Sequence, residues 1–163
     1  MPLVQVRIDD RLIHGQVVVG WRSTLNPERI ILCSDEVANS DWQKTIYMSA
    51  VPEDLKASVL TLNETINLFK DTGKNERILL LVDTPESIVA LVNAGVDIKT
   101  VNVGGMHFRP GKNQIAPFIF VDENDVKNFR ILYDNQIEFD GRDVPSRPSV
   151  DIAKALNFYD EKE

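Results

Sequence analysis

The chain has 163 residues, of which 43% are hydrophobic and 26% charged, a composition that predicts one globular domain over residues 1–163. The formal net charge of −7 argues against non-specific nucleic-acid binding, which requires a basic surface. No segment reaches the roughly 18 apolar residues of a membrane span, the N-terminus lacks the features of a signal peptide, and the single cysteine excludes an internal disulfide.

Apolar runs and helix signals alternate along the chain. In chain order they predict a strand at residues 4–8, a helix at 15–25, a strand at 29–33, a helix at 40–50, a strand at 57–60, a helix at 61–70, a strand at 78–82, a helix at 84–95, a strand at 100–103, a helix at 122–135, an edge strand at 138–144 and a helix at 149–158. This alternation predicts a three-layer α/β/α fold with a mainly parallel central sheet.

Four loops are expected at the carboxyl edge of this sheet, where ligands of such folds bind. They are residues 9–15, 34–39, 83–85 and 104–112. The first and last of these loops contain the two histidines of the chain, His14 and His107. The topology therefore predicts a single site that draws on several loops.

The most informative segment is RIDDRLIHGQV, residues 7–17, in which an apolar strand passes through a charged loop into a helix. His14 stands at the helix start, with Arg11 and Arg7 upstream of it. A helix N-terminus binds anions such as phosphate through unpaired N–H groups and a partial positive charge. A neutral imidazole near guanidinium groups suits a residue that carries a phosphoryl group. The segment therefore predicts phosphoryl transfer through His14, with Gly15 at the phosphate-binding helix start.

This segment resembles the active-site segment of the IIB subunits of the bacterial sugar phosphotransferase system, in the mannose–fructose–sorbose family. Weaker similarities follow at NVGGMHF (102–108), GK (111–112), QI (114–115), VPS (144–146) and VDI (150–152), so the matches span nearly the whole chain in order. The resemblance implies a parallel sheet of six strands plus an extra edge strand. It also implies that His14 is phosphorylated, on Nδ1.

The function that the resemblance implies is that of a phosphocarrier, a protein-N(π)-phosphohistidine–sugar phosphotransferase. Such a subunit accepts a phosphoryl group from a phosphohistidine of a IIA subunit. It passes the group to a sugar held by membrane IIC and IID subunits, and needs no metal or other cofactor. We expect a cytoplasmic protein that associates peripherally with the membrane transporter. The identity of the sugar stays open, and a homodimer is compatible with the sequence.

Two other functions fit parts of the sequence. A regulatory phosphocarrier that is not coupled to sugar transport would have an identical site. A nucleotide-binding α/β enzyme is poorly supported, because the chain has neither a full Gly-x-Gly-x-x-Gly pattern nor a Walker lysine followed by Ser or Thr.

The charged residues before His14 have competing interpretations. Arg11 is the best candidate for stabilising the phosphoryl charge, and its alternative is a surface salt bridge with Asp9, Asp10 or Glu28. Arg7, in or just after a strand, is expected to pair with a carboxylate for structural reasons. Because neighbouring strand residues point to opposite faces, we expect one of the two aspartates to orient His14 or Arg11 and the other to be solvated.

The remaining candidate residues lie in the later loops. Asp83 and Thr84 are candidates for binding or orienting the phosphate. The pair Gly104-Gly105 is either a turn without chemistry or a backbone nest that cradles phosphate. The last group comprises candidates for contact with the IIA partner: His107, Arg109 and Lys112. His107 also fits a supporting role in the site or that of an ordinary loop histidine.

Cys33 requires separate treatment, because other classes of IIB subunit phosphorylate a cysteine. It ends an Ile-Ile-Leu run, which predicts a small buried core residue instead. Two histidines far apart in the sequence and one cysteine also offer no cluster of metal ligands.

Overall fold

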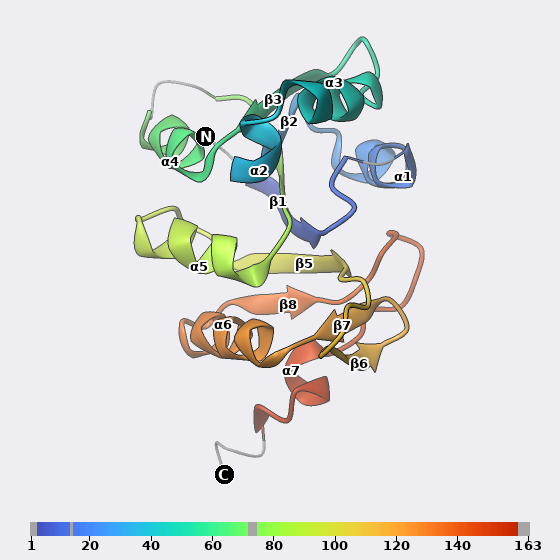
Figure 1. Ribbon diagram of the computed structural model, residues 1–163, viewed down its shortest axis with the longest axis vertical. Helices are drawn as coiled ribbons and strands as arrows, with labels where there is room; N and C mark the ends of the chain where they lie inside the picture. The colour runs from blue at the N-terminus through green and yellow to red at the C-terminus, as the bar shows by residue number, and fades with distance from the viewer. Residues whose placement is uncertain (1–2, 14, 72–74, 160–163) are drawn as a thin grey trace.

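The computed structural model describes residues 3–13, 15–71 and 75–159 of the chain. Its central sheet has six parallel strands in the order β3-β2-β4-β1-β5-β8 (Figure 1). Their bounds are Leu3–Asp9 (β1), Arg29–Cys33 (β2), Lys56–Leu60 (β3), Ile78–Val82 (β4), Thr100–Gly105 (β5) and Glu138–Asp140 (β8). The predicted six-stranded parallel sheet is therefore confirmed.

Helices cover both faces of the sheet. Figure 1 shows α4, α5 and α6 stacked along one face, with α1 and α3 on the other. The helices are α1 (Gly15–Leu25), α2 (Asp35–Ala38), α3 (Asp41–Ser49), α4 (Leu62–Lys70), α5 (Pro85–Asn93), α6 (Glu123–Asp134) and α7 (Ile152–Ala155). No helix within the described ranges has the length and apolar character that crossing a membrane requires.

The sheet separates two apolar cores, and strand β4 supplies both of them. All five of its residues are buried, as its unbroken Ile-Leu-Leu-Leu-Val sequence predicts for a central parallel strand. Successive side chains point to opposite faces. Leu80 thus joins the core beneath α4, α5 and α6, while Leu79 and Leu81 join the core beneath α1.

The helix starts follow the local signals in the sequence. Thr61 and Glu64 form the expected capping box at α4. Thr84 caps α5, with Pro85 in its first turn. Ser40 stands at the N-cap of α3 as expected, although its side chain makes no capping hydrogen bond. These caps determine where the loops at the carboxyl edge of the sheet end.

The C-terminal third differs from the expectation in several elements. The edge strand ends at Asp140 rather than at residue 144, and the next residue, Gly141, forms an isolated antiparallel bridge with Val150 instead of continuing the sheet. The closing helix, expected at residues 149–158, is only α7, and the left-handed φ of 61° at Asn157 follows its end. The remaining strands, β6 (Asn113–Ala116) and β7 (Ile119–Val121), form an unexpected antiparallel pair apart from the central sheet.

Candidate active site

Arg7 is a fully buried arginine at the centre of the site. Its guanidinium donates to the Asp9 carboxylate at 3.0 Å, to the Asp143 carbonyl at 2.8 Å and to the Asn102 side-chain oxygen. It also lies over the Trp21 ring, 5.4 Å from the centroid. Burial lowers the pKa of Arg7 even though Asp9 acts in the opposite direction. The expected structural pairing of Arg7 with a carboxylate is confirmed.

Asp9 holds the backbone and side chain of Arg11. Its Oδ1 accepts hydrogen bonds from Arg11 N and Nε, both at 3.0 Å, and its Oδ2 accepts one from Nη2 at 2.9 Å. Burial opposes ionisation of Asp9, but the bonds from Arg11 and the charges of Arg7 and Arg11 outweigh it and lower the pKa. Asp9 is therefore a buried anion that orients Arg11, as one of the two aspartates was expected to do.

Arg11 combines a salt bridge with partial exposure. The bidentate pair with Asp9 raises the pKa of Arg11, and 27% of its side chain is still exposed. Nε and Nη2 occupy both carboxylate oxygens, which leaves Nη1 on the edge of the guanidinium that faces away from Asp9. Arg11 thus forms the salt bridge with Asp9 that was its alternative role, and this salt bridge also fixes the direction of its guanidinium.

The turn from Asp9 to Ile13 is tightly held. The Leu12 amide donates to the Asp9 carbonyl at 2.9 Å, and Leu12 adopts a φ of 60°, a strained conformation for a branched side chain. Leu12 and Ile13 are both buried and anchor the loop on the core beneath α1. His14 lies outside the described residues. Gly15, predicted to bind phosphate, is the first residue of α1.

Asp10 joins the two loops that carry the histidines. Its amide donates to the Gly105 carbonyl at 3.1 Å, and its carboxylate accepts from the His107 amide at 2.7 Å and contacts His107 Nδ1. The side chain of Asp10 is only 14% exposed, so the expectation that the second aspartate is solvated was wrong. This contact is compatible with the supporting role for His107, and its side chain, more than half exposed, leaves the proposed contact with a partner as a prediction.

Gly104 and Gly105 are the last two residues of β5 and make room for the buried charges. A Cβ at Gly104 would lie 2.0 Å from Cζ of Arg7, and one at Gly105 would lie 3.1 Å from Oδ1 of Asp9. Gly104 is required because the Arg7 guanidinium crosses the backbone of the neighbouring strand at this position. The structure thus places both glycines in β5 and gives them a packing function, so the alternative of a turn was wrong, and phosphate binding by their backbone stays a prediction.

The four predicted loops border one pocket of about 290 Å³. Its lining comprises Asp10, Leu12, Ser34, Glu36, Val37, Gln43, Tyr47, Asp83, Thr84, Arg109 and Lys112. Strands β1, β2 and β4 are parallel neighbours, so the loops that follow them meet at the same edge of the sheet. The parallel arrangement of the strands thus brings residues between positions 10 and 112 together around one pocket.

The charges in this pocket are mixed. The pKa of Asp83 is raised, first by burial and then by the nearby carboxylates of Glu36, Asp10 and Asp35. Asp83 is therefore in acidic surroundings, which disfavour a second anion beside it. The Thr84 hydroxyl accepts from the Ser87 amide at 3.3 Å and caps α5.

Two cations were expected to contact a partner, and they differ in the structure. Lys112 is largely buried, and its Nζ donates to Asp125 at 2.8 Å. Asp125 belongs to the capping box at the start of α6, so Lys112 stabilises that helix. Arg109 lines the pocket and is exposed. Of the two cations, only Arg109 is therefore exposed for contact with a partner.

Several important residues were missed by sequence reasoning. Asn102 donates to the carbonyls of Asp140 and Arg142, both at 3.0 Å, and Trp21 donates to the Asp143 carbonyl at 2.9 Å. Together they tie the chain after β8 to Arg7. The sequence did contain a signal for Asn102, because its side chain stands between two valines of a strand that is expected to be buried. A buried polar side chain requires hydrogen-bond partners.

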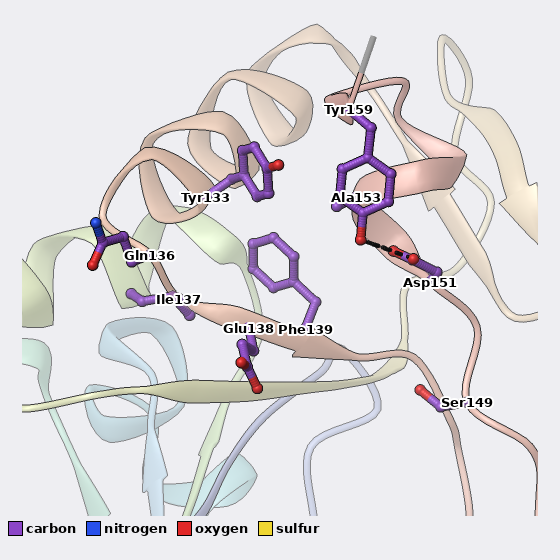
Figure 2. A pocket seen from close by; sticks show the side chains of 9 residues that line it. All are labelled: Tyr133, Gln136, Ile137, Glu138, Phe139, Ser149, Asp151, Ala153 and Tyr159. Atoms are coloured by element: carbon purple, nitrogen blue, oxygen red, sulfur yellow. Dashed lines mark hydrogen bonds between the residues drawn. The ribbon is translucent and has the colours of Figure 1, made fainter. Parts of the chain in front are cut away.

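A larger hollow, of about 540 Å³, lies between α6, β8 and α7, outside this site. Figure 2 shows that it is lined by Tyr133, Phe139 and Tyr159, with the Tyr159 hydroxyl bonded to Asp151. Its charged lining residues are two carboxylates, Glu138 and Asp151. Among the described residues, the lining of the larger hollow has no Lys or Arg, whereas the smaller pocket is lined by Arg109 and Lys112 as well as by carboxylates, so the smaller pocket is the candidate site.

Cys33 is buried in the core, as predicted. Burial raises the pKa of its thiol to about 11. We expect the folded protein to resist iodoacetamide at neutral pH, where roughly one thiol in ten thousand is ionised. Unfolding in urea should increase the alkylation rate by about 100-fold or more, which mass spectrometry would measure. Rapid alkylation of the folded protein would contradict the buried assignment.

The packing of Gly104 against Arg7 generates a second prediction. Gly104→Ala should lower the free energy of unfolding by about 2–4 kcal/mol, because the methyl group displaces a buried, paired guanidinium. Urea denaturation would measure this loss. Gly20→Ala is the matched control, since its Cβ would lie 3.7 Å from Pro145 and the helix favours alanine. Equal stability of the two variants would show that Arg7 moves at no cost.

The sequence matches known proteins over nearly its full length. The family model of the phosphotransferase system (PTS) sorbose subfamily IIB component matches residues 3–163. The sorbose-specific EIIB component of Klebsiella pneumoniae is 37% identical over 158 residues, covering 96% of each chain. The mannose-specific EIIAB component of Escherichia coli (strain K12) is 38% identical over 156 residues, covering 95% of this chain and 48% of that protein.

The fold has equally similar relatives among solved structures. The crystal structure of the IIBSor domain of the sorbose permease from Klebsiella pneumoniae matches with a TM-score of 0.92 and 36% identity. The match covers 97% of this chain and 98% of that chain. Sequence and fold thus agree over the whole domain, and the chain belongs to the sorbose subfamily of IIB components of the phosphotransferase system.

Proposed function

We propose that this IIB component is a cytoplasmic phosphocarrier that accepts a phosphoryl group on Nδ1 of His14 and passes it to a sugar. The donor is a phosphohistidine of a IIA subunit, and the sugar is held by membrane IIC and IID subunits. The observation that carries the proposal is the buried Asp9 carboxylate, which aims the Arg11 guanidinium from the loop just before residue 14. Fixed donors of this kind stabilise the charge of a transferring phosphoryl group.

The transfer requires positioning more than new covalent machinery. A ring nitrogen of His14 attacks the phosphorus as the bond to the donor imidazole breaks, so one N–P bond replaces another. In the second step a sugar hydroxyl attacks the phosphorus as the N–P bond to His14 breaks, so that a phosphate ester forms and the hydroxyl proton is balanced by the N–H of the neutral imidazole that leaves. The Nη1 edge of the Arg11 guanidinium is the proposed contact for the phosphoryl oxygens, together with the backbone N–H groups at the Gly15 end of α1.

The acidic residues of the pocket suit a carrier that must release its cargo. Glu36 and Asp83 border the same pocket as Asp10 and Arg109. Their charges would repel a phosphoryl group and limit the stability of the phosphorylated form, so transfer to the sugar stays favourable. Arg11 lowers the barrier, while the carboxylates prevent the group from being bound too tightly.

The IIA partner is supported by a relative. The mannose-specific EIIAB component of Escherichia coli matches this chain over 48% of its length, and its name includes both a IIA and a IIB component. A phosphorylated donor brings negative charge, so the exposed Arg109 at the pocket rim is its proposed steering contact.

The assignment of the phosphorylated residue is tested by incubating the protein with phosphoenolpyruvate, enzyme I, the histidine phosphocarrier protein and IIA subunits. We expect one acid-labile, base-stable phosphate, mapped to His14 by mass spectrometry. His14→Gln should abolish it, with an unchanged circular dichroism spectrum. Labelling that persists in His14→Gln, or that maps to Cys33, would refute the proposal.

Arg11→Ala should slow phosphoryl transfer by about 100-fold or more, because a charge-assisted contact made in the transition state is lost. Arg11→Lys should recover part of the rate, because lysine keeps the positive charge. Recovery should be incomplete, because an ammonium group cannot bridge both Asp9 oxygens and still reach the phosphoryl group. Rapid-quench single-turnover kinetics would measure both rates. Arg147→Ala, at an arginine that is 61% exposed, is the control. A rate in Arg11→Ala within twofold of the control would reduce Arg11 to a structural residue.

A further inference from the structure

Helix α3 has an apolar face that nothing in the described chain covers. None of its nine residues is buried, and Trp42 and Ile46 are 67% and 54% exposed. These two residues are four positions apart and therefore adjacent on the helix surface. A helix in a globular protein normally turns its apolar face to the core. We refer to Trp42 and Ile46 as the α3 patch, and its exposure favours a role in binding.

The α3 patch lies on the helix that borders the candidate active site. Gln43 and Tyr47, each next in sequence to a patch residue, line the pocket together with Asp10 and Arg109. Tyr47 also packs partly against the core beneath α1, which fixes this side of the helix toward the protein. A partner seated on the α3 patch would therefore reach over the phosphoryl site.

The surroundings of the α3 patch are acidic. Three exposed acidic residues lie on α2 and α3, against the single cation Lys44: Asp35, Glu36 and Asp41. Arg109, by contrast, lines the pocket from the loop before β6 (Figure 1). The rim of the pocket is thus acidic beside α3 and basic at Arg109.

We propose that the α3 patch and its acidic rim dock the cytoplasmic loops of the membrane subunits that hold the sugar. This inference rests on the proposed function, because it names the surface for its second step. Cytoplasmic loops of membrane proteins carry an excess of Lys and Arg, which complements the acidic rim. The phosphorylated donor is negatively charged, so the acidic rim repels it and Arg109 attracts it. The same rim opposes an anionic lipid surface and a second copy of this chain.

The binding test uses inside-out vesicles that contain the IIC and IID subunits of this transporter, with unphosphorylated protein and measurement by sedimentation. Trp42→Ala should weaken binding by about 10-fold or more, as expected for a central aromatic contact. Ile46→Gln should weaken it severalfold. Met48→Gln is the matched control, because Met48 is also exposed, at 41%, but on another side of α3. Its binding should stay within twofold of wild type.

Two further measurements separate the partners. Labelling of His14 by phosphorylated IIA should stay within twofold in Trp42→Ala and Ile46→Gln, which also shows that these variants fold. Arg109→Gln should do the reverse, slowing labelling while leaving vesicle binding unchanged. Asp41→Asn should weaken vesicle binding and reduce its dependence on salt.

Four results would overturn the inference. The first is unchanged vesicle binding in Trp42→Ala, and the second is a loss of labelling by IIA in this variant as large as its loss of vesicle binding. The third is binding to liposomes without the subunits that equals binding to the vesicles. The fourth is a dimer, seen by light scattering, that Trp42→Ala converts to a monomer. The second would assign the α3 patch to the donor, the third to lipid and the fourth to another copy. Because binding is measured without phosphate, failure of His14 labelling would refute the proposed function and leave the docking result interpretable.

Discussion

The buried ion pair between Arg7 and Asp9 is the constraint on which the site depends. Removing two charges from water costs several kcal/mol per ion, so such a pair persists only when its hydrogen bonds are nearly complete. Here the bonds come from three parts of the chain: the loop at Arg11, the amide of Asn102 on β5, and the carbonyl of Asp143 beyond β8. The fold cannot form without bringing these segments together, and the direction of Arg11 follows from that.

The pair also explains features that look unrelated in the sequence. Gly104 lacks a side chain because the Arg7 guanidinium occupies the space where a Cβ would be. Trp21 of α1 is buried under the same guanidinium and donates to the same carbonyl of Asp143. A strand, a helix and a C-terminal loop are thus connected through one cation, and the core holds the loop that carries Arg11 in place.

Charge divides the surface around the pocket in two. Arg109 projects from the loop after β5, whereas α2 and α3 carry exposed carboxylates beside an uncovered apolar face. A carrier that exchanges its cargo with two partners in turn has to present the same reactive group to both. An uneven charge distribution allows one pocket to favour different partners from different sides, because long-range attraction selects the direction of approach.

Much of the fold could be predicted from local patterns. Three local signals each act within a few residues: the apolar run of β4, the capping box at Thr61, and the cap and proline at Thr84 and Pro85. In each case the structure has the predicted strand or helix at that position. Short elements were less predictable. Strand β8 ends at Asp140, and the next residue, Gly141, forms a bridge with Val150, a contact between segments that no local pattern encodes.

The sequence by itself determined the α/β class, the family, the edge of the sheet where the loops gather, and the candidate residues of the RIDDRLIHGQV segment. These follow from periodicity and from a long motif, both of which are local. Only the tertiary structure decided which charges are paired: Asp10 with His107, Lys112 with Asp125, and Asp9 with two arginines. Whether a charged side chain is free or neutralised depends on groups that are distant in sequence and become neighbours through folding, and its chemistry depends on that pairing.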